Sequence, residues 1–299
     1  YSEAERDIID VLIADESHRI RNSSNNRFTP KTTRSPKSQI QELIDCSKVA
    51  VFLIDDKQVV RPNEIGSVEL IKEGAYKNEC QFFEYELDIQ FRCGGSEAFI
   101  NWISNTLGIE KTANVLLEKE ANFDFRIVDS PEVLEKLISG KAAEGFSARM
   151  TAGFCWPWSE ARADGTLVND VVIGGYQRPW NAKPEARKLA AGIPPATLWA
   201  ADPGGINQVG CIYTAQGFEF DYVGVIFGND LIYDFKEAAW QGMKTNNADT
   251  VVKRGGEKFI DLVKNTYRVL LSRGLKGCYV YFVDENTKNF FKSRMEGTQ

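Results

Sequence analysis

Two short apolar runs near the start of the chain predict buried strands. Residues 8–14 and 49–54 are almost wholly aliphatic, apart from one internal aspartate, and each run ends abruptly in acidic residues. Between them, Ser35-Pro36 predicts the start of a helix, and an apolar stripe at helical spacing follows, made of Ile40, Leu43 and Ile44. A strand, a helix and a second strand in this order predict parallel pairing and an open α/β sheet with a right-handed crossover.

The rest of the chain predicts a second series of helices and strands. A helix is expected over residues 63–77, and strict alternation of apolar and acidic or amide side chains predicts a strand over 83–91. Further helices are expected near 95–107 and from Ser130-Pro131 to about Gly140, and an amphipathic helix carries Phe259, Leu262, Val263, Leu270 and Leu271. The other expected strands are 123–128, 149–155, 209–213, 222–227 and 278–283.

This order of elements predicts two α/β lobes, residues 1–85 and residues 86–299. The first lobe is small for a parallel sheet, because two strands and their helices cannot cover both sheet faces, so we expect part of it to lie upstream of Tyr1. Residues 157–208 are rich in Pro, Gly and Trp and show little periodicity, which predicts an irregular insertion in the second lobe.

Composition narrows the class of protein. The 299 residues are 43% hydrophobic and 26% charged, with no apolar run long enough to cross a bilayer, so we expect no membrane partner. Six scattered cysteines without a Cys-x-x-Cys pair, and a single histidine, disfavour a zinc site or a disulfide scaffold and favour a cytoplasmic protein. The chain starts at Tyr1 without a signal peptide, and we interpret it as a fragment.

Charge is distributed unevenly. The net charge is -6, which argues weakly against a dedicated duplex binder. Residues 17–41 nevertheless contain no acidic residue and six basic ones, namely Arg19, Arg21, Arg27, Lys31, Arg34 and Lys37. This stretch is either a solvated loop or a contact for phosphates.

The most specific local signal is Asp15-Glu16 at the carboxyl end of the first apolar run. Ligands bind at this edge of open α/β sheets. In phosphoryl transfer, one such carboxylate holds Mg²⁺ and the other orients or deprotonates the attacking water. Adjacent acids at a strand end are also common as solvated turn residues, so this pair needs support from other motifs.

Five segments in order resemble motifs II to VI of the superfamily 1 helicases, and the chain looks closest to the bacterial Schlafen-like, group 3, DNA/RNA helicase domains. These segments are Asp15-Glu16-Ser17-His18 (the Walker B element), Asp55-Asp56-Lys57-Gln58, Gln90-Phe91-Arg92, residues 213–221 and residues 267–274. The resemblance spans most of the chain and implies two RecA-like lobes of a P-loop NTPase.

The resemblance also implies roles for individual residues. Asp15 would bind Mg²⁺, Glu16 and Gln58 would act on the attacking water, and Arg92 and Arg273 would bind the phosphates of ATP. The nucleotide-binding group would also contain Gln216, Gly217 and Glu219, and Tyr213 and Thr214 would contact a nucleic acid. The implied function is an ATP-dependent helicase or translocase acting on DNA or RNA, with a single strand as its partner.

The sequence departs from the family pattern in several places. It contains no Gly-x-x-x-x-Gly-Lys-Ser/Thr phosphate-binding loop, so we expect this fragment alone to bind ATP poorly. Ile54 stands where many relatives have glycine, and Tyr213 where many have histidine. No nuclease signature is visible, so any cutting activity would lie elsewhere in the whole protein.

Other interpretations remain open at this stage. The chain could be an inactive helicase-like module that binds nucleic acid or protein, in an assembly for defence or with a nuclease, or a hydrolase of small nucleotides. Four aromatic residues, Phe154, Trp156, Trp158 and Trp180, could stack on bases, although packing within the protein is the more common use of such side chains.

Overall fold

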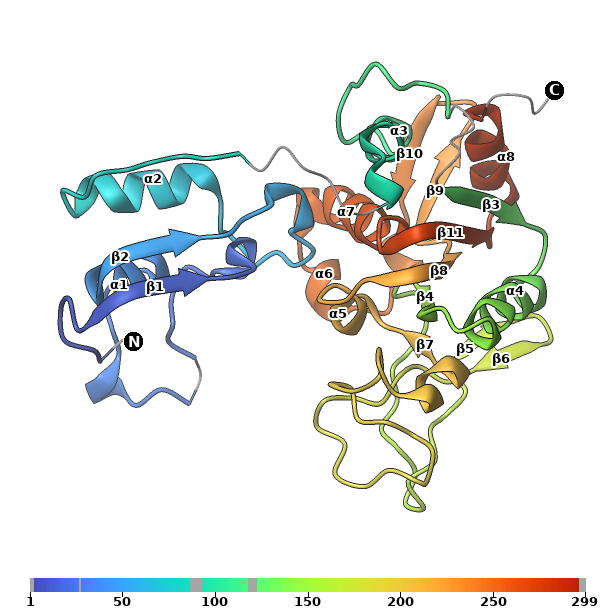
Figure 1. The fold of residues 1–299 in the computed structure, drawn as a ribbon, viewed down its shortest axis with the longest axis horizontal. Helices are drawn as coiled ribbons and strands as arrows, with labels where there is room; N and C mark the ends of the chain where they lie inside the picture. The colour runs from blue at the N-terminus through green and yellow to red at the C-terminus, as the bar shows by residue number, and fades with distance from the viewer. Residues whose placement is uncertain (1–2, 27, 87–92, 118–122, 296–299) are drawn as a thin grey trace. The chain divides into compact units, whose positions relative to one another are not determined.

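The computed structural model describes residues 3–26, 28–86, 93–117 and 123–295. The chain divides into two compact units, unit 1 (Tyr1–Leu87) and unit 2 (Asp88–Gln299) (Figure 1). Both units are built from helices and mainly parallel strands, which confirms the predicted α/β class. In the described part of the chain, no helix combines the length and the apolar character needed to span a membrane.

Unit 1 contains a parallel pair of strands, β1 (Ile9–Ala14) and β2 (Ser47–Phe52), in which Ala14 lies opposite Phe52. The connection between them contains α1 (Gln39–Asp45), as the sequence predicted. This helix begins later than Ser35-Pro36 because Ser38 is its N-cap. The Ser38 side chain accepts a hydrogen bond from the Gln41 amide, and the side-chain oxygen of Gln41 accepts one from the Ser38 amide. The second helix, α2 (Val68–Lys77), has Ser67 as its N-cap, whose side chain accepts from the Leu70 amide.

The core of unit 1 lies on one face of this strand pair. Its buried cluster consists of Ile20, Ile40, Leu43, Ile44 and Ile71, packed against Leu12 and Phe52 of the strands. The alternate side chains, which point to the other face of the strand pair, are exposed, including Val11 at 57%, Ile13 at 67% and Val49 at 52%. The strands are therefore apolar on both faces, and the described helices α1 and α2 bury one of them.

Unit 2 is organised around a parallel sheet with the order β3-β11-β8-β4-β7. The five strands are β3 (Asp124–Val128), β4 (Ala148–Ala152), β7 (Val209–Gly210), β8 (Phe220–Phe227) and β11 (Gly274–Phe282). Helices flank the sheet, which is consistent with a RecA-like P-loop fold. β8 is the central strand and is almost entirely buried.

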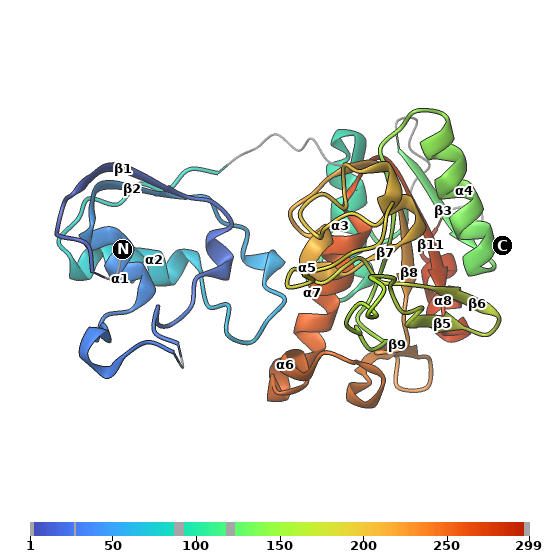
Figure 2. The same cartoon turned by 90° about the horizontal axis from the view of Figure 1, so that it is seen from below.

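The helices of unit 2 cover both faces of the sheet. They are α3 (Glu97–Thr106), α4 (Pro131–Ala143), α5 (Ile212–Ala215), α6 (Thr250–Lys253), α7 (Phe259–Leu271) and α8 (Glu285–Ser293). The helices α4 and α7 lie on opposite sides of the sheet (Figure 2). On one face, Ile138 of α4 lies against Gly224 of β8; on the other, Tyr267 of α7 stacks on Phe227 with ring centroids 3.6 Å apart. As predicted, Ser130-Pro131 starts α4, and α7 is the amphipathic helix before the last strand.

Two antiparallel hairpins, which the sequence pattern did not predict, complete unit 2. β9 (Leu231–Asp234) pairs with β10 (Ala239–Gly242), and β5 (Val171–Ile173) pairs with β6 (Tyr176–Arg178). The second hairpin lies inside the predicted insertion, which is otherwise mostly irregular. Arg149 of β4 anchors this insertion, because its buried guanidinium donates to the carbonyl oxygens of Trp199 and Asp202 at 3.0 and 2.7 Å.

Three strand predictions were wrong in part. The strand expected over 149–155 ends at Ala152. Residues 83–86 form no strand, and Phe83 and Tyr85 are 69% and 86% exposed, so their alternation with acids is not packed against a sheet; the rest of that prediction lies outside the described residues. The strand expected over 209–213 ends at Gly210. It ends there because the Cys211 amide donates to the Asn181 side chain at 2.9 Å, and Cys211 then begins α5.

Candidate functional site

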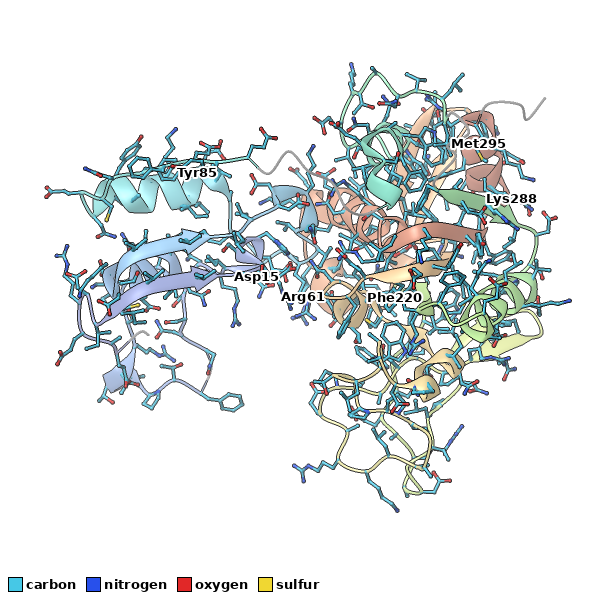
Figure 3. All side chains as sticks on the ribbon, in the orientation of Figure 1. Asp15, Arg61, Tyr85, Phe220, Lys288 and Met295 are labelled. Carbon is cyan, nitrogen blue, oxygen red and sulfur yellow. The ribbon has the colours of Figure 1, made fainter. Side chains whose placement is uncertain are left out.

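Acidic residues follow both strands of unit 1 at the same edge. Asp15 comes directly after β1, at the strand's carboxyl end (Figure 3), and Asp55 follows β2. The two segments stay paired beyond the strands, because the Leu53 amide donates to the Ala14 carbonyl at 2.9 Å and the Ser17 amide donates to the Leu53 carbonyl at 2.8 Å. The residues of motifs II and III therefore lie side by side at the carboxyl edge of a parallel pair.

The turn after β1 fixes the direction of the Glu16 side chain. Glu16 has left-handed backbone angles, φ 52° and ψ 42°, and its amide donates to the Asp15 carboxylate at 2.8 Å. The Nε2 atom of His18 lies 3.2 Å from a carboxylate oxygen of Glu16, and the His18 side chain is almost fully buried. A buried imidazole thus lies beside the Glu16 carboxylate, at the position where the sequence predicts a residue that acts on the attacking water.

Asp55 organises the segment after β2. Its side chain caps a short 3₁₀ turn by accepting from the Lys57 amide at 2.9 Å, and its other oxygen accepts from Gln58 Nε2 at 3.0 Å. Gln58 is buried. The pairing of Asp55 with Gln58 shows how this segment holds an amide side chain beside the acidic edge. Ile54, in place of a glycine, packs against the core cluster of unit 1.

The neighbouring carboxyl group of Asp56 is held in an environment that disfavours its charge. Partial burial, followed by the nearby Glu69 carboxylate, raises the pKa of Asp56 above its ordinary value of 3.8. A folded-state pKa above the unfolded one means that ionising Asp56 costs stability as the pH rises through the folded value. Asp56 is therefore a source of instability at neutral pH within this segment.

We expect Asp56→Asn to stabilise unit 1 at neutral pH. The gain should shrink as the pH falls through the folded pKa of Asp56 and vanish below 3.8, where the carboxyl is protonated in both folded and unfolded states. Urea unfolding followed by circular dichroism at a series of pH values measures this difference. A gain that stays constant between about pH 3 and pH 7 would contradict the assignment.

Gly66 is a positioning residue that the sequence analysis missed. A Cβ atom on Gly66 would lie 1.9 Å from the carbonyl oxygen of Ser17 and 2.9 Å from the Cα of His18. The loop before α2 therefore presses directly on the backbone of motif II. The available signal was a glycine just before the N-cap Ser67, which alone does not reveal a contact 49 residues away in sequence.

In unit 2, Arg273 joins the segments of motifs V and VI. It follows α7, and its Nε and Nη1 atoms donate to the carbonyl oxygens of Val269 at 3.1 Å and of Gln216 at 2.6 Å. Its own carbonyl accepts from the Phe220 amide at the start of β8, at 3.0 Å. Arg273 is 1% exposed. Arg92, the other arginine expected to bind phosphates, lies outside the described residues.

The remaining nucleotide-site candidates lie between α5 and β8. Gln216 ends α5 and is buried, whereas Gly217 and Glu219 are exposed. A Cβ atom on Gly217 would meet nothing within 4 Å, so the fold itself places no steric demand for glycine at this position. Within the described residues, neither a close contact nor a left-handed backbone conformation accounts for a glycine at residue 217.

Tyr213 and Thr214, expected to contact nucleic acid, lie on the short helix α5 rather than on a strand. Both are half-buried. The Tyr213 hydroxyl is hydrogen bonded to the Asp249 carboxylate, and the Thr214 hydroxyl accepts from the Asn181 side chain at 3.0 Å. The two residues are thus held by groups from outside their own helix.

The four aromatic residues Phe154, Trp156, Trp158 and Trp180, in the insertion or just before it, pack together and reach α5. Phe154 contacts the rings of Trp158, Trp180 and Tyr213, with centroids 5.8 to 6.2 Å apart. Each indole N–H is bonded to a main-chain carbonyl: Trp156 to Val172, Trp158 to Asn181 and Trp180 to Pro157. These contacts show that the four aromatic side chains pack within the protein. Phe154, Trp156 and Trp158 are also partly exposed.

The basic stretch of residues 17–41 is mostly exposed loop. Lys37 is paired with Asp45, Arg19 lies 3.7 Å from Glu64, and Arg34 donates to the Thr29 carbonyl. Arg21 and Lys31 are exposed, and Arg27 lies outside the described residues. The stretch is therefore solvated, and part of its charge is balanced within unit 1.

The fold and the placement of the motifs define an α/β protein of the RecA-like P-loop type, with acidic residues at a parallel strand edge. The sequence matches the family "Schlafen group 3, DNA/RNA helicase domain" over residues 1–284, so the chain belongs to this family. The family name indicates a helicase-like function with a nucleic-acid partner.

A relative extends beyond the matched region. The chain is 27% identical over 309 aligned residues to "Uncharacterized protein YPL245W" of Saccharomyces cerevisiae (strain ATCC 204508 / S288c). The match covers 92% of this chain and 63% of that protein. The chain therefore spans a little under two thirds of the length of this relative.

Proposed function

We propose that this chain is the motor core of an ATP-dependent helicase or translocase that acts on single-stranded DNA or RNA. The observation that carries the proposal is the edge of unit 1, where Asp15-Glu16 and Asp55-Gln58 follow two paired parallel strands. Ligands of open α/β sheets bind at this edge. Membership of a helicase-domain family points to the same use.

The donor set of this edge fits Mg²⁺ bound together with ATP. In the described part of the chain, no cluster of three or more His, Cys, Asp or Glu side chains is arranged to hold a metal ion. Mg²⁺ in phosphoryl-transfer sites usually keeps several waters and takes one or two carboxylates, with substrate phosphates completing the shell. The exposed Asp15 carboxylate meets that requirement, and the ion would offset phosphate charge.

Each of the candidate residues then has a separate role in ATP hydrolysis. Glu16, held by His18, accepts the proton of the attacking water, and Gln58, held by Asp55, orients that water. Arg273 and Arg92 supply guanidinium groups for the charge that develops on the phosphates, a contribution of about 10³ to 10⁵ in rate for such arginines. Gln216, Gly217 and Glu219 bind the nucleotide, with Glu219 accepting a hydrogen bond from a ribose hydroxyl.

The link between Arg273 and α5 suggests how hydrolysis is coupled to nucleic acid. Arg273 is bonded to the carbonyl of Gln216, which ends the helix that carries Tyr213 and Thr214. A shift of the guanidinium group on phosphate release would therefore be transmitted through one helical turn to the residues that contact the strand. The motif V segment acts as the connection between the two ligands.

The test is ATP hydrolysis by the full-length protein with and without oligonucleotides. We expect phosphate release to rise several-fold when oligo(dT) or oligo(rU) is added, and to remain unchanged with a duplex lacking single-stranded ends. Turnover that is indifferent to every nucleic acid would instead support a small-nucleotide hydrolase. Nucleic-acid binding without any turnover would support an inactive binding module.

A further inference from the structure

Asn181, a residue of the insertion in unit 2, contacts the motif V segment directly. Asn181 follows β6 and lies beside β7: its amide donates to the Val209 carbonyl at 2.8 Å, and Trp180 forms an isolated parallel bridge with Val209. The Asn181 side chain is fully buried. It therefore stands at the junction of the insertion, the last sheet strand and α5.

Each polar atom of the Asn181 side chain has a partner. Oδ1 accepts from the Cys211 amide at 2.9 Å. Nδ2 donates to the Ala182 carbonyl at 2.9 Å and to the Thr214 hydroxyl at 3.0 Å. The Asn181 carbonyl also accepts from the Trp158 indole at 2.8 Å, which ties the aromatic cluster to the same point.

These partners fix which way the amide is oriented. A backbone N–H can only donate and a backbone carbonyl can only accept, so Cys211 requires the oxygen of Asn181 and Ala182 requires its nitrogen. The nitrogen must then face Thr214 as well, and it has only protons to offer. The Thr214 hydroxyl is thereby forced to act as the acceptor of this bond.

An accepting hydroxyl keeps its own proton for another partner. A threonine in a helix commonly turns that proton back to the carbonyl four residues earlier, as Thr266 does with Leu262 at 3.0 Å. Thr214 is half-buried on a helix of four residues, and its hydroxyl oxygen accepts a hydrogen bond from the Asn181 side chain. Among the hydrogen bonds of the described residues, Thr214 Oγ1 accepts from Asn181 and donates to no protein acceptor, so its proton can be offered to a ligand.

We propose that Asn181 is a positioning residue that presents the Thr214 hydroxyl as a donor to a phosphate oxygen of single-stranded nucleic acid. This inference rests on the proposed function, in which Thr214 contacts the strand. It assigns a task to the irregular insertion: the segment sets the hydrogen-bond direction of a residue that lies 33 positions further along the chain.

Asn181→Asp is the sharpest variant, because it keeps the shape and replaces the donating nitrogen by an accepting oxygen. Thr214 would then donate its proton inward and lose it for the phosphate. Fluorescence anisotropy with a labelled oligo(dT) of about 20 nucleotides measures the affinity of the full-length protein. We expect a loss of about tenfold for Asn181→Asp and for Thr214→Val, no further loss in the double variant, and retention of binding in Thr214→Ser.

The outcomes separate this inference from the proposed function. If Thr214→Val binds like the unaltered protein, the nucleic-acid role of Thr214 fails. If Thr214→Val weakens binding and a folded Asn181→Asp does not, only the role of Asn181 fails. Ser159→Ala is the matched control, because it removes a 2.9 Å bond to Asp170 within the same insertion without contacting Thr214, and its affinity should be unchanged.

A second measurement avoids any change at Asn181, in case the aspartate variant does not fold. The two side-chain amide protons of Asn181 have different acceptors, Ala182 and Thr214, and give separate nuclear magnetic resonance signals. Addition of oligo(dT) should shift mainly the signal of the proton that faces Thr214, and Thr214→Val should abolish that shift. Equal shifts of both signals, or none, would overturn the proposal.

Discussion

Replacing Glu16 by glutamine should lower the nucleic-acid-stimulated ATP turnover of the full-length protein by at least about 100-fold, while nucleotide binding is retained. Glutamine keeps the size of the side chain but cannot take the proton of the attacking water, and a positioned general base contributes about 10² to 10⁴ in rate. The contact with His18 also changes, since its Nε2 atom lies 3.2 Å from a carboxylate oxygen of Glu16 in the native protein and would face an uncharged amide in the variant. Steady-state phosphate release and titration with a fluorescent ATP analogue measure the two quantities.

Asp10→Asn is the matched control for Glu16→Gln. Asp10 lies on β1, the strand that precedes Glu16, and its exposed carboxylate is paired with Lys48 at 2.6 Å, so the substitution removes one negative charge away from the edge. We expect turnover within about twofold of the native value, since exposed ion pairs contribute little. Equal turnover in Glu16→Gln and Asp10→Asn would remove Glu16 from the mechanism.

The helices α1, α2, α3, α4 and α7 and the strands of the two parallel sheets could be predicted because their signals are local, whereas α5, α6 and α8 were not predicted. Ser130-Pro131 starts α4 where a serine N-cap and a proline in the first turn are expected, and the apolar stripe of α7 packs against the sheet as its spacing predicts. The same holds for β1 and β2, whose apolar runs pair in parallel. Short-range patterns of this kind need no knowledge of distant partners.

The wrong predictions depend on partners that the sequence does not reveal. Residues 83–86 alternate like a strand, but alternation produces a strand only when a neighbouring strand is available to pair with it. Cys211 could have continued β7, and the buried amide of Asn181, 30 residues earlier, captures its N–H instead. A long-range hydrogen bond therefore decides that Tyr213 and Thr214 lie on a helix.

In the candidate site, too, the features set by local sequence patterns could be predicted and those set by long-range contacts could not. Asp15 and Asp55 could be brought together in advance, because both follow parallel strands and the carboxyl ends of such strands share an edge. The contacts that hold this edge in place could not be predicted, since the approach of Gly66 to Ser17 and the bond between Gln58 and Asp55 depend on loop geometry. The roles of Arg92 and Arg273 remain predictions.

Gly66→Ala should disrupt the edge of unit 1 more than any other single methyl addition in that unit. The added Cβ would lie 1.9 Å from the Ser17 carbonyl oxygen. The three nearest atoms all belong to the backbone of Ser17 and His18, so no flexible side chain can move away to make room. We expect a loss of about 3 kcal/mol in the free energy of unfolding of unit 1, at the upper end for overpacked sites, together with loss of ATP turnover through displacement of Glu16.

The location of the damage distinguishes this effect from a general loss of stability. Hydrogen exchange of peptides covering residues 9–20 should accelerate in Gly66→Ala. All six tryptophans lie in unit 2, so the tryptophan fluorescence transition in urea reports on the stability of unit 2 separately. Gly140→Ala is the control: a Cβ atom there meets nothing within 4 Å inside helix α4, and it should stabilise unit 2 by about 0.5 to 1 kcal/mol. Unchanged exchange over residues 9–20 in Gly66→Ala would show that the loop before α2 does not hold the acidic turn in place.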